Sequence, residues 1–90
     1  MREKTIEQYL CDAALRHGGR AYKWVSPGRV GVPDRLVVLP GGNVFGVECK
    51  APGKTPTVLQ ARIHAELRAL GLEVAVVDSR EAVDLLMGDI

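Results

Sequence analysis

Two acidic residues in the centre of the chain lie on predicted strands that a tight turn joins. Asp34 opens the run Arg35–Leu39, whose aliphatic and β-branched residues favour a strand. Residues 40–43, with the sequence Pro-Gly-Gly-Asn, are typical of a tight turn. A second strand follows and leads to Glu48 and Lys50. The pattern predicts an antiparallel hairpin that can bring Asp34 beside Glu48 and Lys50, although its pairing register is not fixed by sequence.

Side-chain alternation along the second of these strands separates its polar residues from its apolar residues. Residues two apart share one face of a strand. Glu48 and Lys50 are therefore expected to project together. Phe45, Val47 and Cys49 are expected to project the other way, into the core. This strand is predicted to have one apolar face and one face assigned to polar groups.

The residue types in the hairpin suit a divalent metal ion. Mg²⁺ prefers oxygen ligands and is usually held by one or two carboxylates, with water and substrate phosphate. Asp34 and Glu48 can supply the carboxylates, and the main-chain carbonyl of Cys49 can supply a third oxygen. Lys50 adds a compact positive charge that can orient a water or stabilise a transition state. Taken alone, Glu48 and Lys50 are more typical of a structural ion pair on a solvated sheet face.

Several further motifs occur in a fixed order around the hairpin. They are Tyr22-Lys23-Trp24, Ser26-Pro27-Gly28-Arg29, Gly31-Val32-Pro33-Asp34-Arg35-Leu36, Val47-Glu48-Cys49-Lys50-Ala51-Pro52-Gly53-Lys54, and Gln60. In order and spacing they resemble the VRR-Nuc domains of the PD-(D/E)xK nuclease superfamily, found as stand-alone proteins in bacteriophage and as modules of DNA-repair enzymes. The resemblance implies a restriction-endonuclease-like α/β fold with a mixed central sheet, and metal-dependent hydrolysis of DNA by an endonuclease. It also implies Mg²⁺, for which Mn²⁺ substitutes, and no organic cofactor.

The resemblance adds one residue from each of two predicted helices to the site. A helix-borne glutamate completes the acidic cluster, directly or through water, and Glu7 fits this role better than Glu3 because it borders the apolar stripe. Gln60 is expected near the start of the second helix, where its amide can bond Lys50 or a carboxylate. The catalytic residues so implied are Glu7, Asp34, Glu48, Lys50 and Gln60, and the metal ligands are Asp34, Glu48, the Cys49 carbonyl and Glu7.

The charge of the chain is nearly balanced, at a net +1. Contacts to a polyanion are therefore expected from a local basic cluster, from the metal ion or from two copies acting together. A chain of 90 residues has little surface left to read a base sequence, so structure-selective cutting is predicted. The resemblance implies branched DNA, such as a Holliday junction, and a homodimer. The basic residues near the site in sequence, and hence the predicted DNA contacts, are Lys23, Arg29, Arg35 and Lys54.

Hydrophobic periodicity and helix-capping residues predict one domain, residues 1–90, in the order αβββαβα. Thr57 is expected to cap the second helix, and Asp78 or Ser79 the third. No stretch has the length of a membrane span and no signal-peptide pattern opens the chain, so a cytoplasmic location is expected. The resemblance implies that the cell is bacterial or phage-infected. The predicted elements are helices over residues 3–17, 57–70 and from 79, and strands over 20–25, 35–39, the motif stretch ending near 49, and 73–77.

The remaining conspicuous residues are assigned structural roles. His64 is expected to be a surface or packing residue rather than a catalytic base, and Trp24 a packing residue. Cys11 and Cys49 are expected to be free thiols, because two cysteines and two separated histidines lack the spacing of a zinc site. A non-catalytic nucleic-acid-binding or assembly module with the same fold is the alternative function, and the intact Asp34, Glu48 and Lys50 argue against it.

Overall fold

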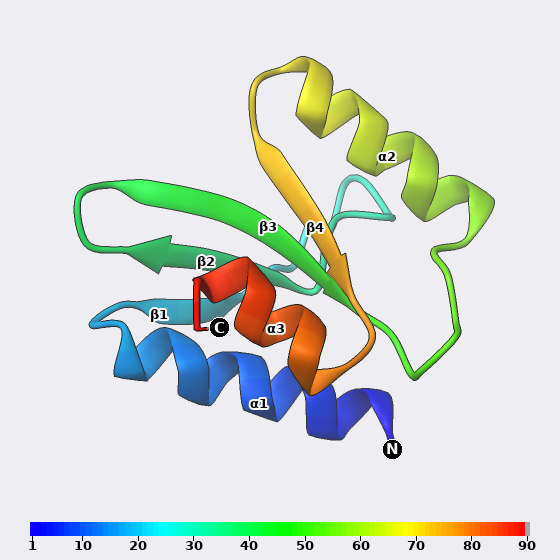
Figure 1. Ribbon diagram of the computed structural model, residues 1–90. Helices are drawn as coiled ribbons and strands as arrows, with labels where there is room; N and C mark the ends of the chain where they lie inside the picture. Colours follow the sequence, from blue (N-terminus) through cyan, green and yellow to red (C-terminus); the bar gives the residue numbers. More distant parts are fainter. Residues whose placement is uncertain (90) are drawn as a thin grey trace.

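The computed structural model describes residues 1–89, which form three helices and one four-stranded mixed sheet (Figure 1). The elements follow the chain in the predicted order αβββαβα. The strands lie in the order β1-β2-β3-β4, antiparallel except for the parallel pair β3 and β4. Within residues 1–89, no helix is long and apolar enough to cross a membrane. The elements are α1 (Glu3–Arg16), β1 (Arg20–Lys23), β2 (Arg35–Leu39), β3 (Asn43–Cys49), α2 (Val58–Ala69), β4 (Glu73–Val77) and α3 (Arg80–Met87).

The hairpin of β2 and β3 has the register that brings its acidic residues together. Arg35 pairs with Val47, so Asp34, which precedes β2, comes level with Glu48. Oδ2 of Asp34 accepts a hydrogen bond from the main-chain N–H of Cys49 at 2.9 Å. This contact ties the segment before β2 to the end of β3 and thereby locates one carboxylate of the predicted site.

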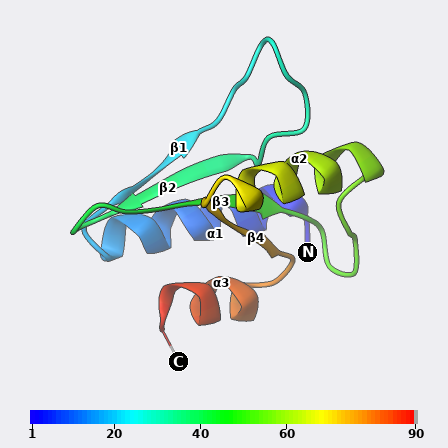
Figure 2. The same cartoon turned by 90° about the horizontal axis from the view of Figure 1, so that it is seen from above.

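The main core lies between the sheet and the pair of helices α1 and α3. Figures 1 and 2 show α3 on the opposite side of the sheet from α2. Phe45, Val47 and Cys49 point into this core, as the alternation predicted. Complete burial of a side chain such as Val47 stabilises the fold by about 1.5–3 kcal/mol. The other core residues are Ile6, Leu10, Ala13, Ala14, Ala21, Val37, Val77, Val83 and Met87.

Helix α2 closes the other face of the sheet. Ile63 and Val74 are buried there, and the guanidinium group of Arg68 donates hydrogen bonds to the carbonyl of Val74 at 2.8 and 3.2 Å. Gly31 has a φ of +108°, and a Cβ atom at this position would lie 2.8 Å from Cγ1 of Ile63. Only glycine therefore lets the loop before β2 approach α2 so closely. Because α2 covers this face, Glu48 is 1% exposed instead of lying on a solvated surface.

The start of α2 is fixed by a capping box. The Thr57 hydroxyl accepts from the N–H of Gln60 at 3.1 Å, and the Gln60 side-chain oxygen accepts from the N–H of Thr57 at 2.9 Å. This arrangement satisfies two amides that a helix start would leave without partners. Thr57 therefore caps α2, as predicted. Of the two predicted caps of α3, Ser79 is the one that caps the helix. The capping box also fixes Gln60 in the first turn of α2.

Strand β1 is shorter than predicted and ends at Lys23 rather than Val25. Its partner β2 begins at Arg35, and Pro33, two residues earlier, has no N–H to donate to the strand ladder. The main-chain N–H of Trp24 donates one further hydrogen bond, to the carbonyl of Asp34 at 3.0 Å. The Trp24 ring packs over Gly46, as expected of a packing residue.

Candidate functional site

Asp34, Glu48 and Lys50 meet at one end of the β2–β3 hairpin. Nζ of Lys50 lies 3.4 Å from Oε2 of Glu48. The side chains of Lys50 and Glu48 are 13% and 2% exposed, so their ion pair is largely shielded from solvent. The Asp34 carboxylate lies close enough to raise the pKa of Glu48. The structure therefore brings together the three residues that the hairpin pattern singled out.

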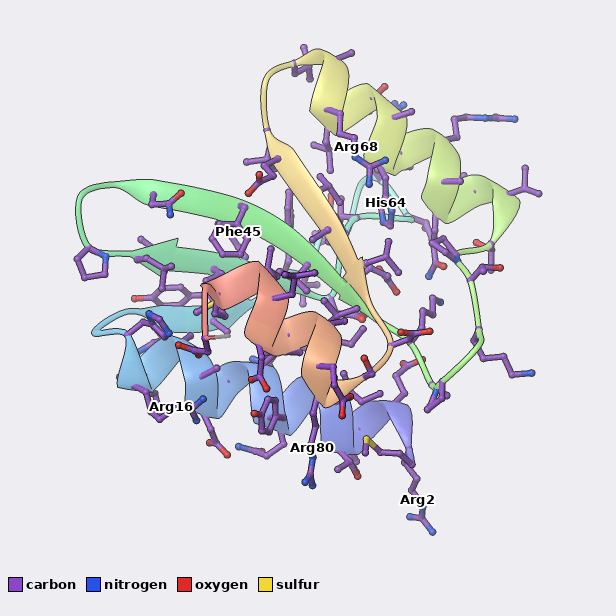
Figure 3. All side chains as sticks on the ribbon, in the orientation of Figure 1. Arg2, Arg16, Phe45, His64, Arg68 and Arg80 are labelled. Carbon is purple, nitrogen blue, oxygen red and sulfur yellow. The ribbon has the colours of Figure 1, made fainter. Side chains whose placement is uncertain are left out.

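Helix α2 contributes two further side chains to this group. Nε2 of Gln60 donates a long hydrogen bond, 3.5 Å, to Oε2 of Glu48, in agreement with the predicted position of Gln60. Nε2 of His64 lies 3.6 Å from Oε1 of the same carboxylate. His64, which Figure 3 labels on α2, was expected at the surface or in the packing. It is 1% exposed, and its Nε2 approaches the Glu48 carboxylate. Its position one helical turn after Gln60 is the sequence signal that predicts a shared face.

Burial and a neighbouring negative charge make Glu48 a weak acid. Removal from water, followed by the Asp34 carboxylate, raises the pKa of Glu48 to about 7 from its ordinary 4.5, and the ammonium group of Lys50 opposes the rise. Burial also lowers the pKa of His64, with smaller contributions from Arg68 and Lys50. Near neutral pH, the metal-free site thus carries a carboxylate for which ionisation is costly.

The raised pKa of Glu48 predicts a pH-dependent stability of the metal-free protein. The pKa of Glu48 is about 7 in the folded state and 4.5 in the unfolded state. Its contribution to the free energy of unfolding is therefore fully present below pH 4.5 and is lost as pH rises through 7. Glu48→Gln is expected to remove this loss, and to raise the free energy of unfolding at pH 8 by up to about 3 kcal/mol relative to the wild type. Urea unfolding in EDTA from pH 5 to 8 measures the free energy of unfolding of both proteins. Equal pH slopes for the two proteins would contradict the assignment.

The donor set fits a Mg²⁺ ion. Oε1 of Glu48 is buried and has no hydrogen-bond partner within residues 1–89, so this carboxylate is incompletely satisfied without a cation. Asp34 and Glu48 supply two hard oxygen donors of the kind that Mg²⁺ accepts. In the described part of the chain, no three His, Cys, Asp or Glu side chains form a metal-binding group. The remaining ligands would therefore be a main-chain carbonyl, water and substrate phosphate.

Glu7 is engaged by basic residues away from the carboxylate pair. Its Oε2 accepts from Nε of Arg35 at 2.7 Å and lies 3.6 Å from Nζ of Lys23. These contacts are on the face of the sheet that α1 covers, whereas Glu48 projects toward α2. Glu7 rather than Glu3 borders the buried stripe of α1, as predicted, but the structure does not join it to Asp34 and Glu48. The role of Glu7 as a metal ligand remains a prediction.

The four predicted DNA contacts differ in their surroundings. Arg35 and Lys23 share the carboxylate of Glu7. Arg29 is bound to Glu66 of α2 at 2.7 Å and so ties the loop before β2 to that helix. Lys54 is exposed in the loop that links β3 to α2. Of the four, Lys54 is the one that extends from the Glu48 end of β3 into solvent.

A basic band runs over the N-terminal half of α1; sequence reasoning singled out its Lys23 and Arg35 as DNA contacts but missed Arg2, Lys4 and Arg80. Two open hollows of about 460 and 190 Å³ adjoin there, and Lys4 and Gln8 line both. The side chains that line them carry five positive and two negative charges, although the whole chain has a net charge of only +1. Residues distant in sequence meet at this surface, so linear spacing gave no signal for it. We call this surface the α1 basic band, formed by Arg2, Lys4, Thr5, Glu7, Gln8, Tyr9, Asp12, Lys23, Arg35 and Arg80.

Comparison with known proteins identifies the family of this chain. No family model matches the sequence. The chain is 55% identical, over 86 residues, to a protein named "Putative nuclease p44" of Acyrthosiphon pisum secondary endosymbiont phage 1, with 96% of this chain and 92% of that protein covered. A solved structure named "VRR_NUC domain" superposes with a TM-score of 0.90 at 36% identity, and covers 96% of this chain and 94% of its own. The αβββαβα arrangement is accordingly the restriction-endonuclease-like fold that was predicted. The chain therefore belongs to the VRR-Nuc domain nucleases.

Proposed function

We propose that the protein is a Mg²⁺-dependent endonuclease of the PD-(D/E)xK type that hydrolyses phosphodiester bonds in DNA, with a preference for branched substrates. The observation that carries this proposal is the carboxylate pair of half-buried Asp34 and buried Glu48, beside the ammonium group of Lys50. Two carboxylates and one cation suit a divalent ion and a substrate phosphate together. Membership of a nuclease family supports the same reaction class.

Each side chain of the site has a distinct task in this reaction. Asp34 and Glu48 would hold the ion, with the Cys49 carbonyl as a third oxygen. Bound Mg²⁺ supplies a water of lowered pKa and neutralises charge on the phosphate. Lys50, which lies against Oε2 of Glu48, can donate to the attacking water or to the phosphate oxygen that gains charge. Gln60 donates to the same Oε2 and thereby restricts the rotation of the carboxylate.

The α1 basic band and Lys54 are the proposed contacts to the DNA backbone. Arg35 of the band directly follows Asp34 in the chain, and the band extends across α1 to Arg80 at the start of α3. Figure 3 shows Arg2 and Arg80 at the outer surface of these helices. Basic side chains concentrated in this way attract phosphate without reading bases. The band thus favours binding governed by the shape of the DNA.

Removing charge from the α1 basic band is expected to weaken DNA binding without affecting the chemical step. The double variant Arg2→Ala/Arg80→Ala is expected to lower affinity about 10-fold and to reduce the slope of log K against log salt by about 2. The matched control is Arg20→Ala/Arg62→Ala, which removes two exposed arginines outside the band. Fluorescence anisotropy in Ca²⁺ at several salt concentrations measures both quantities. Equal losses in the two double variants would exclude the band as the contact surface.

The proposed working unit is a homodimer. Exposed apolar side chains lie on the loop before β2 and at the start of α2, two segments that the ion pair of Arg29 with Glu66 holds together. Burial of these side chains between two copies would stabilise the dimer through the hydrophobic effect. Closed two-fold symmetry would also present two sites to a substrate with paired strands. The exposed apolar side chains on these two segments are Val25, Val30, Val58 and Leu59.

Cleavage of a labelled four-way junction tests the proposed function. In Mg²⁺ we expect paired, symmetric nicks near the branch point, and no cleavage in EDTA. A linear duplex of the same sequence is the control for structure selectivity and is expected to be cut more slowly. Light scattering of the same sample is expected to give about twice the 9.7 kDa of one chain. Equal cleavage in EDTA would refute the metal requirement, and a monomer that cuts junction strands independently would refute the dimer.

A further inference from the structure

Two buried polar atoms face each other in the site without forming a hydrogen bond. They are Oε1 of Glu48 and Nε2 of His64, which lie 3.6 Å apart. Neither atom has a hydrogen-bond partner among residues 1–89, and each residue is 1% exposed. A separation of 3.6 Å exceeds that of a hydrogen bond. Since buried polar atoms without partners cost stability, packing alone does not explain a histidine at this position.

The two oxygens of the Glu48 carboxylate have different neighbours. Oε2 contacts Nζ of Lys50 at 3.4 Å and Nε2 of Gln60 at 3.5 Å. Oε1 is directed at the imidazole of His64, which enters from one turn further along α2. The carboxylate is thus contacted by the helix at both oxygens. A small decrease in the distance between Nε2 and Oε1 would bring the two atoms into hydrogen-bond range.

We propose that His64 is a positioning residue that donates a hydrogen bond from Nε2–H to Oε1 of Glu48 when a divalent cation binds. The donated bond fixes the plane of the carboxylate that would hold the cation. The assignment rests on the proposed function to the extent that it requires a divalent cation at Asp34 and Glu48. Hydrogen-bond partners of metal ligands act in this way, by orienting the ligand and restricting the wrong geometries. A neutral imidazole with its proton on Nε2 provides the single donor that this arrangement needs.

Variants of His64 separate this positioning role from simple packing. His64→Leu fills space but donates nothing, whereas His64→Gln keeps an N–H donor at about the place of Nε2. His17→Gln is the matched control, because His17 bonds Asp89 beyond the end of α1. Binding of Mn²⁺ alone, measured by calorimetry, is expected to weaken about 10- to 100-fold in His64→Leu. His64→Gln is expected to stay within about threefold of the wild type, and His17→Gln to bind as the wild type does.

The melting temperature of the metal-free variants gives a second, opposite readout. Since Nε2 of His64 makes no hydrogen bond within residues 1–89, His64→Leu is expected to melt at or above the wild-type temperature. Loss of Mn²⁺ affinity with unreduced stability is the signature of a positioning residue. A lower melting temperature in both variants, with Mn²⁺ affinity unchanged, would overturn the proposal and leave His64 as a packing residue.

Spectroscopy of the wild-type protein tests the donor directly and requires no variant to fold. In ¹⁵N imidazole spectra, addition of Mg²⁺ is expected to shift the Nε2–H proton of His64 downfield and slow its exchange with water. A proton on Nδ1 alone in the Mg²⁺-bound protein would overturn the proposal. A wild type with these signatures that cuts no DNA would refute the proposed function and leave the role of His64 intact. DNA cleavage and Mn²⁺ binding that are unchanged in His64→Leu would refute the role of His64 alone.

Discussion

Replacing Asp34 with Asn is expected to slow DNA cleavage in Mg²⁺ at least about 1,000-fold, equivalent to about 4 kcal/mol of transition-state stabilisation. Asn has the size of Asp and its Oδ1 can still accept the hydrogen bond from the N–H of Cys49. The variant therefore keeps the tie between β3 and the segment before β2, and loses only the charge that would hold the proposed cation. Single-turnover cleavage of a four-way junction measures the effect, and the melting temperature verifies the fold.

The control for the loss of a carboxylate is Glu73→Gln, at the exposed start of β4. This variant removes the same charge from the other end of the sheet and is expected to cut as the wild type does. Glu48→Gln is expected to match Asp34→Asn in activity. A cleavage rate within tenfold of the wild type in Asp34→Asn would remove Asp34 from the site.

Replacing Lys50 with Ala is expected to lower the single-turnover rate about 100- to 1,000-fold while affinity for DNA changes less than about threefold. The reason is its position, since Nζ lies 3.4 Å from the Glu48 carboxylate in a shielded site and not on the outer surface. A charge placed there can act on the water or on the transition state, but contributes little to the capture of the polyanion. Rates at saturating DNA and affinities in Ca²⁺ separate the two effects.

Lys54→Ala is the matched control for Lys50→Ala. Lys54 is exposed on the loop that leaves β3, so its loss is expected to reduce affinity and salt dependence and to leave the chemical step unchanged. An unchanged rate in Lys50→Ala at saturating DNA would instead make Lys50 a structural partner of Glu48.

Local sequence features were sufficient to predict the strands and the capped helices. Period-two alternation placed Phe45, Val47 and Cys49 in the core, and glycines with a proline identified the turn of the hairpin. Thr57 is recognisable as a cap because its partner in the capping box is only three residues away. The carboxylate pair followed once the hairpin was recognised, since Asp34 directly precedes its first strand and Glu48 lies on its second. In each case the interacting residues are close in sequence.

Contacts between distant segments could not be read in this way. Nothing near Glu48 in sequence indicates that α2 covers it, so its burial and raised pKa emerged only from the folded chain. The contact of Glu7 with Arg35 depends on how α1 packs on the sheet. The α1 basic band likewise depends on the meeting of α1 with α3. Tertiary packing decides which charges meet, and it leaves little trace in sequence spacing.

Gln60 joins helix initiation to site geometry in a single amide group. Its oxygen accepts from the N–H of Thr57, and its nitrogen donates to Oε2 of Glu48. Both ends of the amide are therefore committed, and the group has only one acceptable orientation. A glutamate at this position would preserve the helix start but would place a third negative charge beside Asp34 and Glu48. An asparagine would be one methylene too short to reach both partners. Selection for a correctly started helix and selection for a correctly oriented carboxylate thus act on the same residue. A substitution at position 60 affects the orientation of Glu48 even where it preserves the helix start.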